Sequence, residues 1–198
     1  MKLEAVELRR VELPLVSPFR TSFGTTNERE ALLVHLLTPE AEGWGECVAL
    51  SEPVFSSEYV DGVERVIRDH LLPRLFSLDG VTAEAVAPAL AMVRGHPMAK
   101  AALEMAILDA ELRAEGVSLA MRLGAVREEV ECGVSVGIVD TIPELLDAVG
   151  RYLDEGYRRI KLKIEPGWDL EPVGAVRERF GDIPLQVDAN AAYELADA

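Results

Sequence analysis

Near its C-terminal end the chain alternates strictly between aliphatic and basic residues. Ile160, Leu162 and Ile164 are separated by Lys161 and Lys163. Successive side chains of a strand point to opposite faces, so the two lysines share one face and the three aliphatic residues share the other. The pattern predicts a strand that has one apolar and one polar face.

A second strand of the same kind is predicted at residues 185–190, where Leu, Val and Ala take one face and Gln, Asp188 and Asn190 take the other. Residues 169–180 between the two strands have helical periodicity, and Gly181 follows them. A strand-helix-strand order implies a parallel sheet that is covered on both sides. The polar face of such a sheet is therefore not a simple solvated surface.

A similar unit precedes these strands. Residues 131–137 predict a short strand, and Thr141 to Glu144 form a capping box that opens a helix ending at Gly156. Ser135 falls on the polar face by parity, because its neighbours are valines. In a (β/α) barrel that face points inward, where strand-end residues form the active site. Two ammonium groups and a carboxylate there suggest a bound metal or anion and a lysine for proton transfer.

The N-terminal half predicts an α+β domain. Alternating or apolar runs at residues 3–13, 31–37 and 43–47 fit a three-stranded antiparallel meander. Residues 17–27 predict a long connection whose two phenylalanines either pack into the core or form a lid over a ligand. Residues 50–56 form a second connection with exposed apolar groups.

Helices are expected around the meander. One spans residues 57–76 until Pro73 disturbs it. Another spans residues 97–115 and is apolar on nearly all sides, which predicts a buried helix with Gly116 as its C-cap. A short helix through residues 119–123 would end at Gly124.

Composition excludes several classes of protein. The chain has 198 residues, with 20 basic and 35 acidic side chains and a net charge of -15, which disfavours nucleic acid and anionic lipid as partners. No secretory signal and no membrane-length apolar run is present, so we expect no membrane association and a cytoplasmic location.

The isolated Cys47 and Cys132 predict buried, reduced thiols. The three histidines lack partners at metal-ligand spacing.

Several motifs together resemble a known family. Arg-Ile-Lys-Leu-Lys-Ile-Glu-Pro-Gly at 159–167, followed by Gln-Val-Asp-Ala-Asn at 186–190, resembles the second and third barrel strands of the enolase superfamily, muconate-lactonizing subgroup. Residues 18–24, 43–47 and 133–138 resemble N-acylamino acid racemases, also called N-succinylamino acid racemase/o-succinylbenzoate synthases. The resemblance covers the whole chain.

The resemblance implies an α+β capping domain at residues 1–126, made of a β-meander plus helices. It also implies that residues 127–198 begin a modified (β/α) TIM-type barrel, with three strands and two helices. Lys163 would be the general acid/base and Lys161 its electrostatic neighbour, whose charge repels that of Lys163. Asp188 would be the first of three carboxylate metal ligands. The substrate-binding residues would be Ser135, Asn190, Phe19, Phe23, Leu50 and Phe55, the last four in an acyl-group pocket covered by the two loops.

The implied chemistry is removal of the proton α to a carboxylate, with Mg²⁺ (or Mn²⁺ or Co²⁺) stabilising the enediolate and with no organic cofactor. The expected partner is a small carboxylate substrate that carries an apolar or succinyl N-acyl group. Racemisation, o-succinylbenzoate synthesis or both would follow, and the complete protein is expected to be a homo-oligomer.

A complete barrel needs about 250 residues, and the family's other two carboxylate ligands and its opposing lysine are expected on later strands. We therefore expect this chain to be the N-terminal part of the enzyme, with the barrel incomplete at the C-terminus, and to be inactive alone. Two alternatives stay open: a dipeptide epimerase or muconate cycloisomerase of the same superfamily, and a non-catalytic truncated homologue.

Overall fold

The structure, a computed structural model, describes residues 1–197. These residues form two compact units, one comprising Met1–Leu13 with Arg29–Val126 and the other Pro14–Glu28 with the residues from Arg127 onward. The predicted boundary between residues 126 and 127 assigned residues 14–28 to the capping domain, whereas these residues group with the second unit. Each unit is described by itself.

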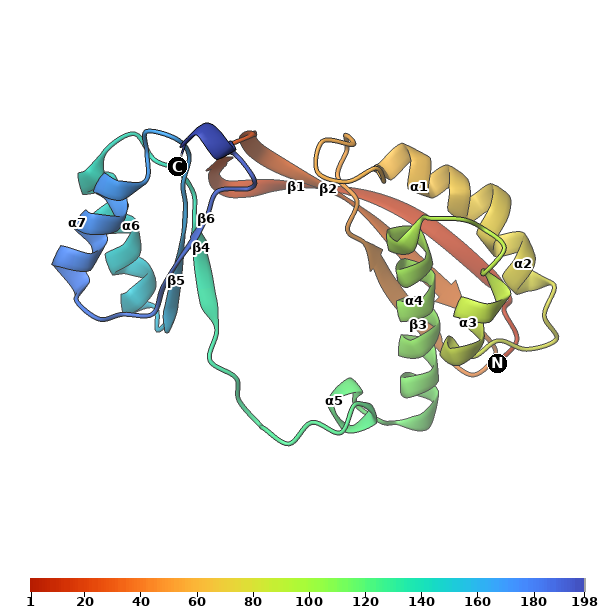
Figure 1. Ribbon diagram of the computed structural model, residues 1–198. Helices are drawn as coiled ribbons and strands as arrows, with labels where there is room; N and C mark the ends of the chain where they lie inside the picture. The colour runs from red at the N-terminus through yellow and green to blue at the C-terminus, as the bar shows by residue number, and fades with distance from the viewer. Residues whose placement is uncertain (198) are drawn as a thin grey trace. The chain divides into compact units, whose positions relative to one another are not determined.

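A three-stranded sheet organises the first unit, although the end of its first strand and the start of its second, within residues 14–28, belong to the second unit. Its strands are β1 (Ala5–Thr21), β2 (Gly24–Leu37) and β3 (Glu42–Cys47), in the order β1-β2-β3. β2 and β3 are antiparallel, with Leu32 opposite Cys47 and Leu37 opposite Glu42. The predicted meander is confirmed, and Figure 1 shows how far its first two strands extend.

The long connection predicted at residues 17–27 is wrong. β1 continues to Thr21 and β2 starts at Gly24, so only Ser22 and Phe23 form the turn of a long hairpin. Pro18 lies within the predicted connection, but β1 is the edge strand of its sheet, where a residue without an N–H donor is tolerated. Gly24 has a φ of 151°, a conformation that favours glycine.

The helix predicted at residues 57–76 begins later and is divided. α1 (Val60–Val66) leads into a π-helical turn, η1 (Ile67–Leu71), and then into α2 (Leu72–Phe76). Pro73 does not end the helix, which continues through it to Phe76, and it lies directly after the π-helical turn. A further helix, α3 (Ala83–Ala89), was not predicted.

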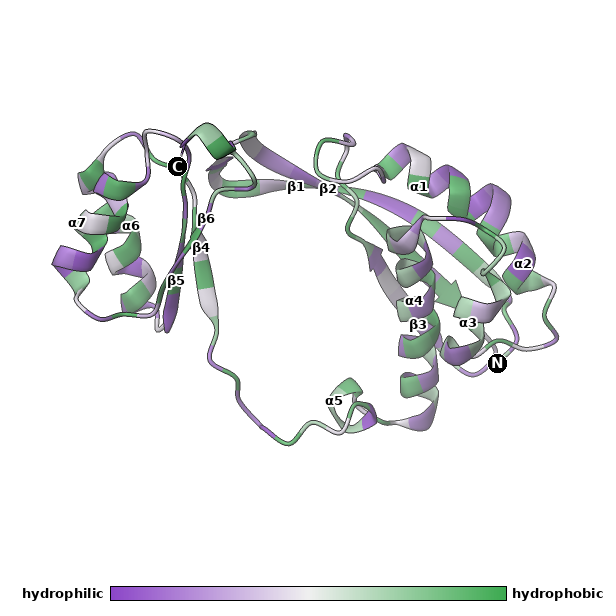
Figure 2. Cartoon of the chain, viewed as in Figure 1, coloured by the Kyte–Doolittle hydropathy of each residue, from purple (hydrophilic) through white to green (hydrophobic). Residues whose placement is uncertain are grey.

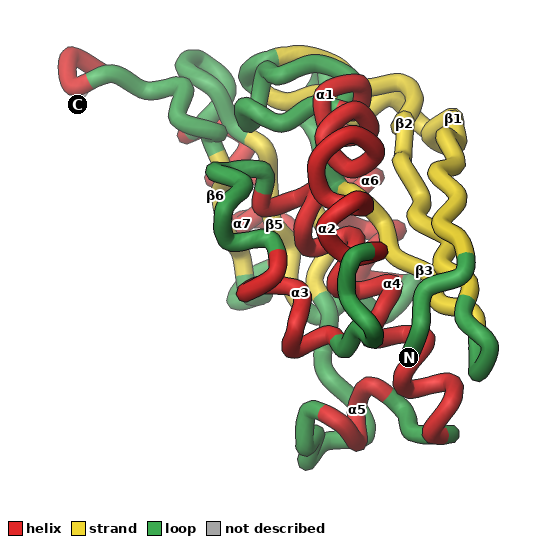
Figure 3. The backbone as a smooth tube through the Cα atoms, turned by 90° about the vertical axis from the view of Figure 1, so that its right-hand side faces the viewer, coloured by secondary structure: helices red, strands yellow, loops and turns green. Residues whose placement is uncertain are grey.

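α4 (Pro97–Glu115) has the predicted bounds, and Gly116 follows it with a φ of 67°. The short α5 (Leu119–Arg122) also forms as expected, and loops flank it on both sides (Figure 3). The prediction that α4 is buried on nearly all sides is wrong: Ala101 and Ala114 are exposed, and Met105 is 43% exposed. The helix packs on the sheet with the face that carries Ala102, Ala106 and Ala110, all fully buried.

Two glycines of β3 allow this packing. A Cβ atom added at Gly43 would lie 2.0 Å from the backbone oxygen of Ala106, and one added at Gly45 would lie 2.1 Å from that of Ala102. The obstacle in both places is helix backbone, which cannot turn aside as a flexible side chain does. The glycines therefore set the distance between α4 and the sheet.

We expect Gly45→Ala to lower the free energy of unfolding by about 1–3 kcal/mol, because overpacking forces α4 away from β3. Denaturant unfolding followed by tryptophan fluorescence, to which the neighbouring Trp44 contributes together with Trp168, measures this. Gly80→Ala is the matched control, since its Cβ would meet only the Met1 carbonyl oxygen at an ordinary 3.6 Å. Equal stability of the two variants would contradict the assigned role of Gly45.

The second unit contains three parallel strands, β4 (Gly133–Val136), β5 (Arg159–Lys163) and β6 (Leu185–Asp188), in that order. The helices α6 (Ile142–Asp154) and α7 (Leu170–Phe180) lie on one side of them (Figure 1). Thr141 accepts a hydrogen bond from the Glu144 N–H, which confirms this half of the predicted capping box. A 3₁₀ turn (Leu195–Asp197) follows.

The apolar faces of strands and helices meet as predicted. Ile160 and Leu162 of β5 are 0% and 1% exposed and pack with Val149 of α6 and Val176 of α7. Hydrophobic and hydrophilic stretches accordingly alternate along both helices (Figure 2). Within residues 1–197 the parallel sheet has three strands, so these are the first units of a barrel rather than a closed barrel.

The cysteine prediction is half right. Both thiols are free, but only Cys47 is buried. Cys132 is exposed because it immediately precedes β4, outside the hydrophobic core between the strands and their helices.

Candidate functional site

The carboxyl ends of β5 and β6 bring three predicted site residues together. Lys163 lies opposite Asp188 in the parallel register. Its Nζ donates hydrogen bonds to Asp188 Oδ2 at 2.7 Å and to Asn190 Oδ1 at 2.6 Å. Lys163 is only 8% exposed, so these two oxygens hold its ammonium group where little water reaches it.

Lys161, which lies two residues before Lys163 in β5, belongs to the same cluster. Its Nζ lies 3.2 Å from Asp188 Oδ2, the oxygen that also accepts from Lys163. The two lysines were expected to repel each other directly, and the structure places one shared carboxylate oxygen beside both. Asp188 thus screens the repulsion between them.

The backbone after β6 bends sharply at this cluster. Asn190 and Ala191 have φ values of 48° and 59°, a left-handed conformation that Asn tolerates better than most residues. The bend lets the Asn190 N–H donate to Asp188 Oδ1 at 3.0 Å. Both carboxylate oxygens of Asp188 are therefore held in place.

Ser135 lies on the same face, in one row with Lys161 and Gln186 across the three strands. Its Oγ is buried and has no hydrogen-bond partner among the described residues. A shallow depression in this face is lined by Ser135, Lys161 and Gln186 together with Gly133 and Arg159. A buried hydroxyl without a partner is costly, which fits a role in binding something that supplies one.

Electrostatics hold Asp188 in its ionised form. The hydrogen bond from Lys163 is the largest cause, and with smaller contributions from the Asn190 N–H and Lys161 it outweighs partial burial and lowers the pKa of Asp188 from 3.8 to about 2. A depressed carboxyl pKa contributes stability that is complete above the unfolded-state value, about 4. That contribution is lost as the pH falls toward 2.

We expect the Asp188 carboxyl carbon, followed by NMR in metal-free protein, to titrate with a midpoint near 2. Lys163→Met should move this pKa upward toward the ordinary value, because the strongest stabilising donor is gone. A wild-type midpoint at or above 3.8 would show that the lysines do not hold the carboxylate as described.

Residues near the hairpin turn also contact this end of the sheet, and sequence reasoning did not assign them a role. Ser22 Oγ donates to the carbonyl oxygen of Ala189 at 2.7 Å, and the Arg20 guanidinium pairs with Asp140 and Glu165 at 3.1 Å each. Asp140 and Glu165 follow β4 and β5 closely. The sequence signal that could have pointed to these contacts was the presence of charged residues just after the predicted strands.

The four predicted acyl-pocket residues are divided between the units. Phe19 is partly buried, and its ring lies near Gly137, where an added Cβ would be 3.4 Å from Cδ2. Phe23 belongs to the same unit and is 51% exposed, whereas Leu50 and the 67% exposed Phe55 belong to the other. That these residues form one pocket stays a prediction.

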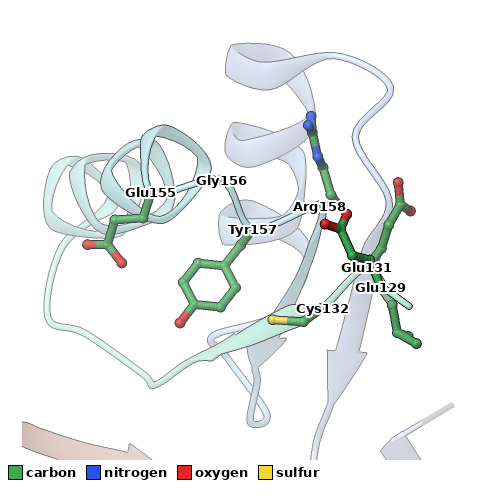
Figure 4. A pocket seen from close by; sticks show the side chains of 8 residues that line it. Glu129, Glu131, Cys132, Glu155, Gly156, Tyr157 and Arg158 are labelled. Carbon is green, nitrogen blue, oxygen red and sulfur yellow. The ribbon is translucent and has the colours of Figure 1, made fainter. Parts of the chain in front are cut away.

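A second depression lies at the opposite ends of the strands (Figure 4). It is formed by the segment that leads into β4, with Glu131 and Cys132, and by the connection between α6 and β5, with Tyr157 and Arg158. None of the predicted site residues lines it. This depression is therefore separate from the Lys163–Asp188 cluster.

Within residues 1–197, no group of three or more His, Cys, Asp or Glu side chains lies close enough to hold a metal ion. Asp188 is thus one carboxylate that would need further ligands.

No helix formed by residues 1–197 is long and apolar enough to cross a membrane.

Comparison with known proteins identifies the family. Residues 4–124 match the family model described as mandelate racemase/muconate lactonizing enzyme, N-terminal domain, and residues 144–198 match the model described as enolase C-terminal domain-like. The chain belongs to the mandelate racemase/muconate lactonizing enzyme family. This confirms the predicted membership of the enolase superfamily.

Relatives within this family are named enzymes. The chain is 66% identical to the N-succinylamino acid racemase of an Amycolatopsis species and 43% identical to the o-succinylbenzoate synthase of Geobacillus kaustophilus, in both cases over 100% of its own length. It covers 54% and 53% of these two proteins, so it spans about half the length of the curated relatives that it matches.

A solved structure supports the fold of both family segments. The enolase-superfamily member from Listeria innocua matches with a TM-score of 0.92 and 36% sequence identity, over 100% of this chain and 53% of that one. The family is therefore one of enzymes, with a capping domain that precedes parallel β/α units.

Proposed function

We propose that the full-length protein removes the proton α to the carboxylate of an N-acylamino acid, acting as an N-succinylamino acid racemase, an o-succinylbenzoate synthase or both. The observation that carries the proposal is the convergence of Lys163, Lys161 and Asp188 at the carboxyl ends of β5 and β6. The names and identities of the two relatives support the substrate class.

Lys163 is the proposed general acid/base. It is the less exposed lysine of the pair and stands at the last position of β5. To accept a proton it must first lose one, which leaves a neutral amine with a lone pair for the substrate proton and two N–H donors for Asp188 and Asn190. Lys161, which contacts the same oxygen of Asp188, can then retain the ion pair alone.

A divalent cation, Mg²⁺ or alternatively Mn²⁺ or Co²⁺, fits the chemistry of this donor set. Asp188 offers a carboxylate and Asn190 an amide oxygen, the hard oxygen donors that such ions prefer. Asp188 would hold the ion, together with carboxylates outside the described residues. When bound, the ion would stabilise the negative charge that develops on the substrate carboxylate as the α-proton leaves.

Substrate binding is proposed for the remaining predicted residues. Ser135 has a buried hydroxyl that lacks a partner in the described residues, so it would hydrogen-bond the substrate beside Asn190. Phe19, Phe23, Leu50 and Phe55 would surround the apolar or succinyl N-acyl group. We also propose a cytoplasmic location and a homo-oligomeric full-length protein.

Residues 1–198 by themselves should be inactive. One carboxylate is present at the site, and no group of three metal-ligating side chains occurs in residues 1–197. Full turnover by a monodisperse 198-residue protein would overturn this part of the proposal.

The test is an assay of the full-length protein with Mg²⁺ on N-succinylamino acids and on the o-succinylbenzoate precursor. We expect turnover of at least one of the two. Dipeptides and muconate are assayed in parallel, and activity on these alone would replace the proposal with the epimerase or cycloisomerase alternative. Failure on all four substrate classes would favour a non-catalytic protein.

A further inference from the structure

The turn of the β1–β2 hairpin is held against all three parallel strands at their carboxyl ends. We call residues 19–23 the hairpin tip. The Ile138 N–H, just after β4, donates to the carbonyl oxygen of Arg20 at 2.9 Å. Ser22 donates to Ala189, which lies between the site residues Asp188 and Asn190.

Arg20 supplies the charged contacts of the hairpin tip. Its Nη1 lies 3.1 Å from Asp140 Oδ1, beyond β4, and its Nη2 lies 3.1 Å from Glu165 Oε1, beyond β5. A planar guanidinium presents several donors in a fixed geometry, so one arginine can bridge two carboxylates, which the single ammonium of lysine does less well. Arg20 thereby ties the hairpin tip to the loops that follow β4 and β5.

Gly137 allows the close approach. An added Cβ there would lie 3.1 Å from the Arg20 carbonyl oxygen and 3.2 Å from the Arg20 N. The strand end and the hairpin tip are thus fitted to each other by backbone as well as by charge. All of these residues belong to one compact unit.

We propose that Arg20 is a positioning residue that keeps the hairpin tip docked over the Lys163–Asp188 cluster and thereby determines how tightly an N-acylamino acid is bound. Arg20 acts through the tip, which carries Phe19 and Phe23, and takes no part in proton transfer. The inference rests on the proposed function for its substrate, whereas the docking itself is independent of it.

Docking is measured without substrate by the hydrogen exchange of the Ile138 amide in the full-length protein. We expect Arg20→Gln to accelerate this exchange about threefold to tenfold, the combined effect of losing two exposed ion pairs. Glu165→Gln removes one of the pairs and should give a smaller acceleration. Unchanged Ile138 exchange in Arg20→Gln would overturn the proposal, whatever the enzyme's substrate is.

The expected kinetic consequence is a higher KM with little change in kcat. For the N-succinylamino acid that the wild type turns over best, Arg20→Gln should raise KM by a similar factor and change kcat less than about twofold. A fall in kcat at constant KM would overturn the positioning role. So would accelerated Ile138 exchange that leaves KM unchanged.

Two further variants separate positioning from general instability. Arg10 also bridges carboxylates, namely Glu30, Asp61 and Glu64, but away from the hairpin tip. Arg10→Gln should therefore leave Ile138 exchange and KM at wild-type values. Exchanging the charges in Arg20→Glu/Glu165→Arg should restore part of the protection that Arg20→Glu loses, and no recovery would contradict the bridge to Glu165.

Discussion

Replacing Lys163 by Ala is expected to abolish exchange of the substrate α-proton on one stereochemical face. A positioned general acid/base contributes about 10²–10⁴-fold to the rate. The loss should reach this range because Lys161, the other amine of the cluster, lies two residues earlier in β5 and is held by Asp188. Incorporation of deuterium from solvent into each enantiomer of the substrate, followed by NMR, measures the effect.

Two variants make this test specific. Lys163→Arg keeps a positive charge beside Asp188 and Asn190, but a guanidinium stays protonated at every accessible pH and cannot accept the proton. It should therefore lose exchange as Lys163→Ala does. Lys2→Ala removes an exposed lysine far along the chain and should change nothing. Retained exchange in the arginine variant would assign Lys163 an electrostatic role instead of proton transfer.

The polar cluster on the sheet was predictable because it depends on local rules. Alternation along β5 fixes which side chains share a face, and the buried Ile160 and Leu162 opposite Lys163 confirm it. Pairing of parallel strands one unit apart then brings Asp188 to Lys163. Neither step needs information from outside residues 160–190.

The hairpin tip was not predictable in the same way. Pro18 and the small polar residues at 17–27 locally favour a loop, and only pairing between β1 and β2 makes the segment part of two strands. Arg20 meets Asp140 across 120 residues and Glu165 across 145 residues of chain. No periodicity reports such contacts. The same holds for Gly45, whose role appears only when the backbone of α4 is placed beside it.

Asp188→Asn should be nearly as damaging as the loss of Lys163. The substitution keeps the size of the side chain and one oxygen, but it removes the negative charge that a dication requires. We expect Mg²⁺ affinity of the full-length protein, measured by calorimetry, to fall by at least about 100-fold, since changes in mere outer-shell partners of metal ligands already cost about 10–100-fold. Asp169→Asn, at the start of α7, is the control and should bind Mg²⁺ normally.

Asp188 has two roles that this variant separates. Its Oδ2 lies 2.7 Å from Lys163 Nζ and 3.2 Å from Lys161 Nζ, so it also neutralises charge between the lysines. If Asp188 only neutralises charge between the two lysines, Asp188→Asn will bind Mg²⁺ like the wild type. It will then lose activity because Lys161 and Lys163 are no longer held by a carboxylate. If Asp188 is a ligand, affinity and activity will fall together. Because calorimetry needs no turnover, it decides between the two roles even where the variant is inactive.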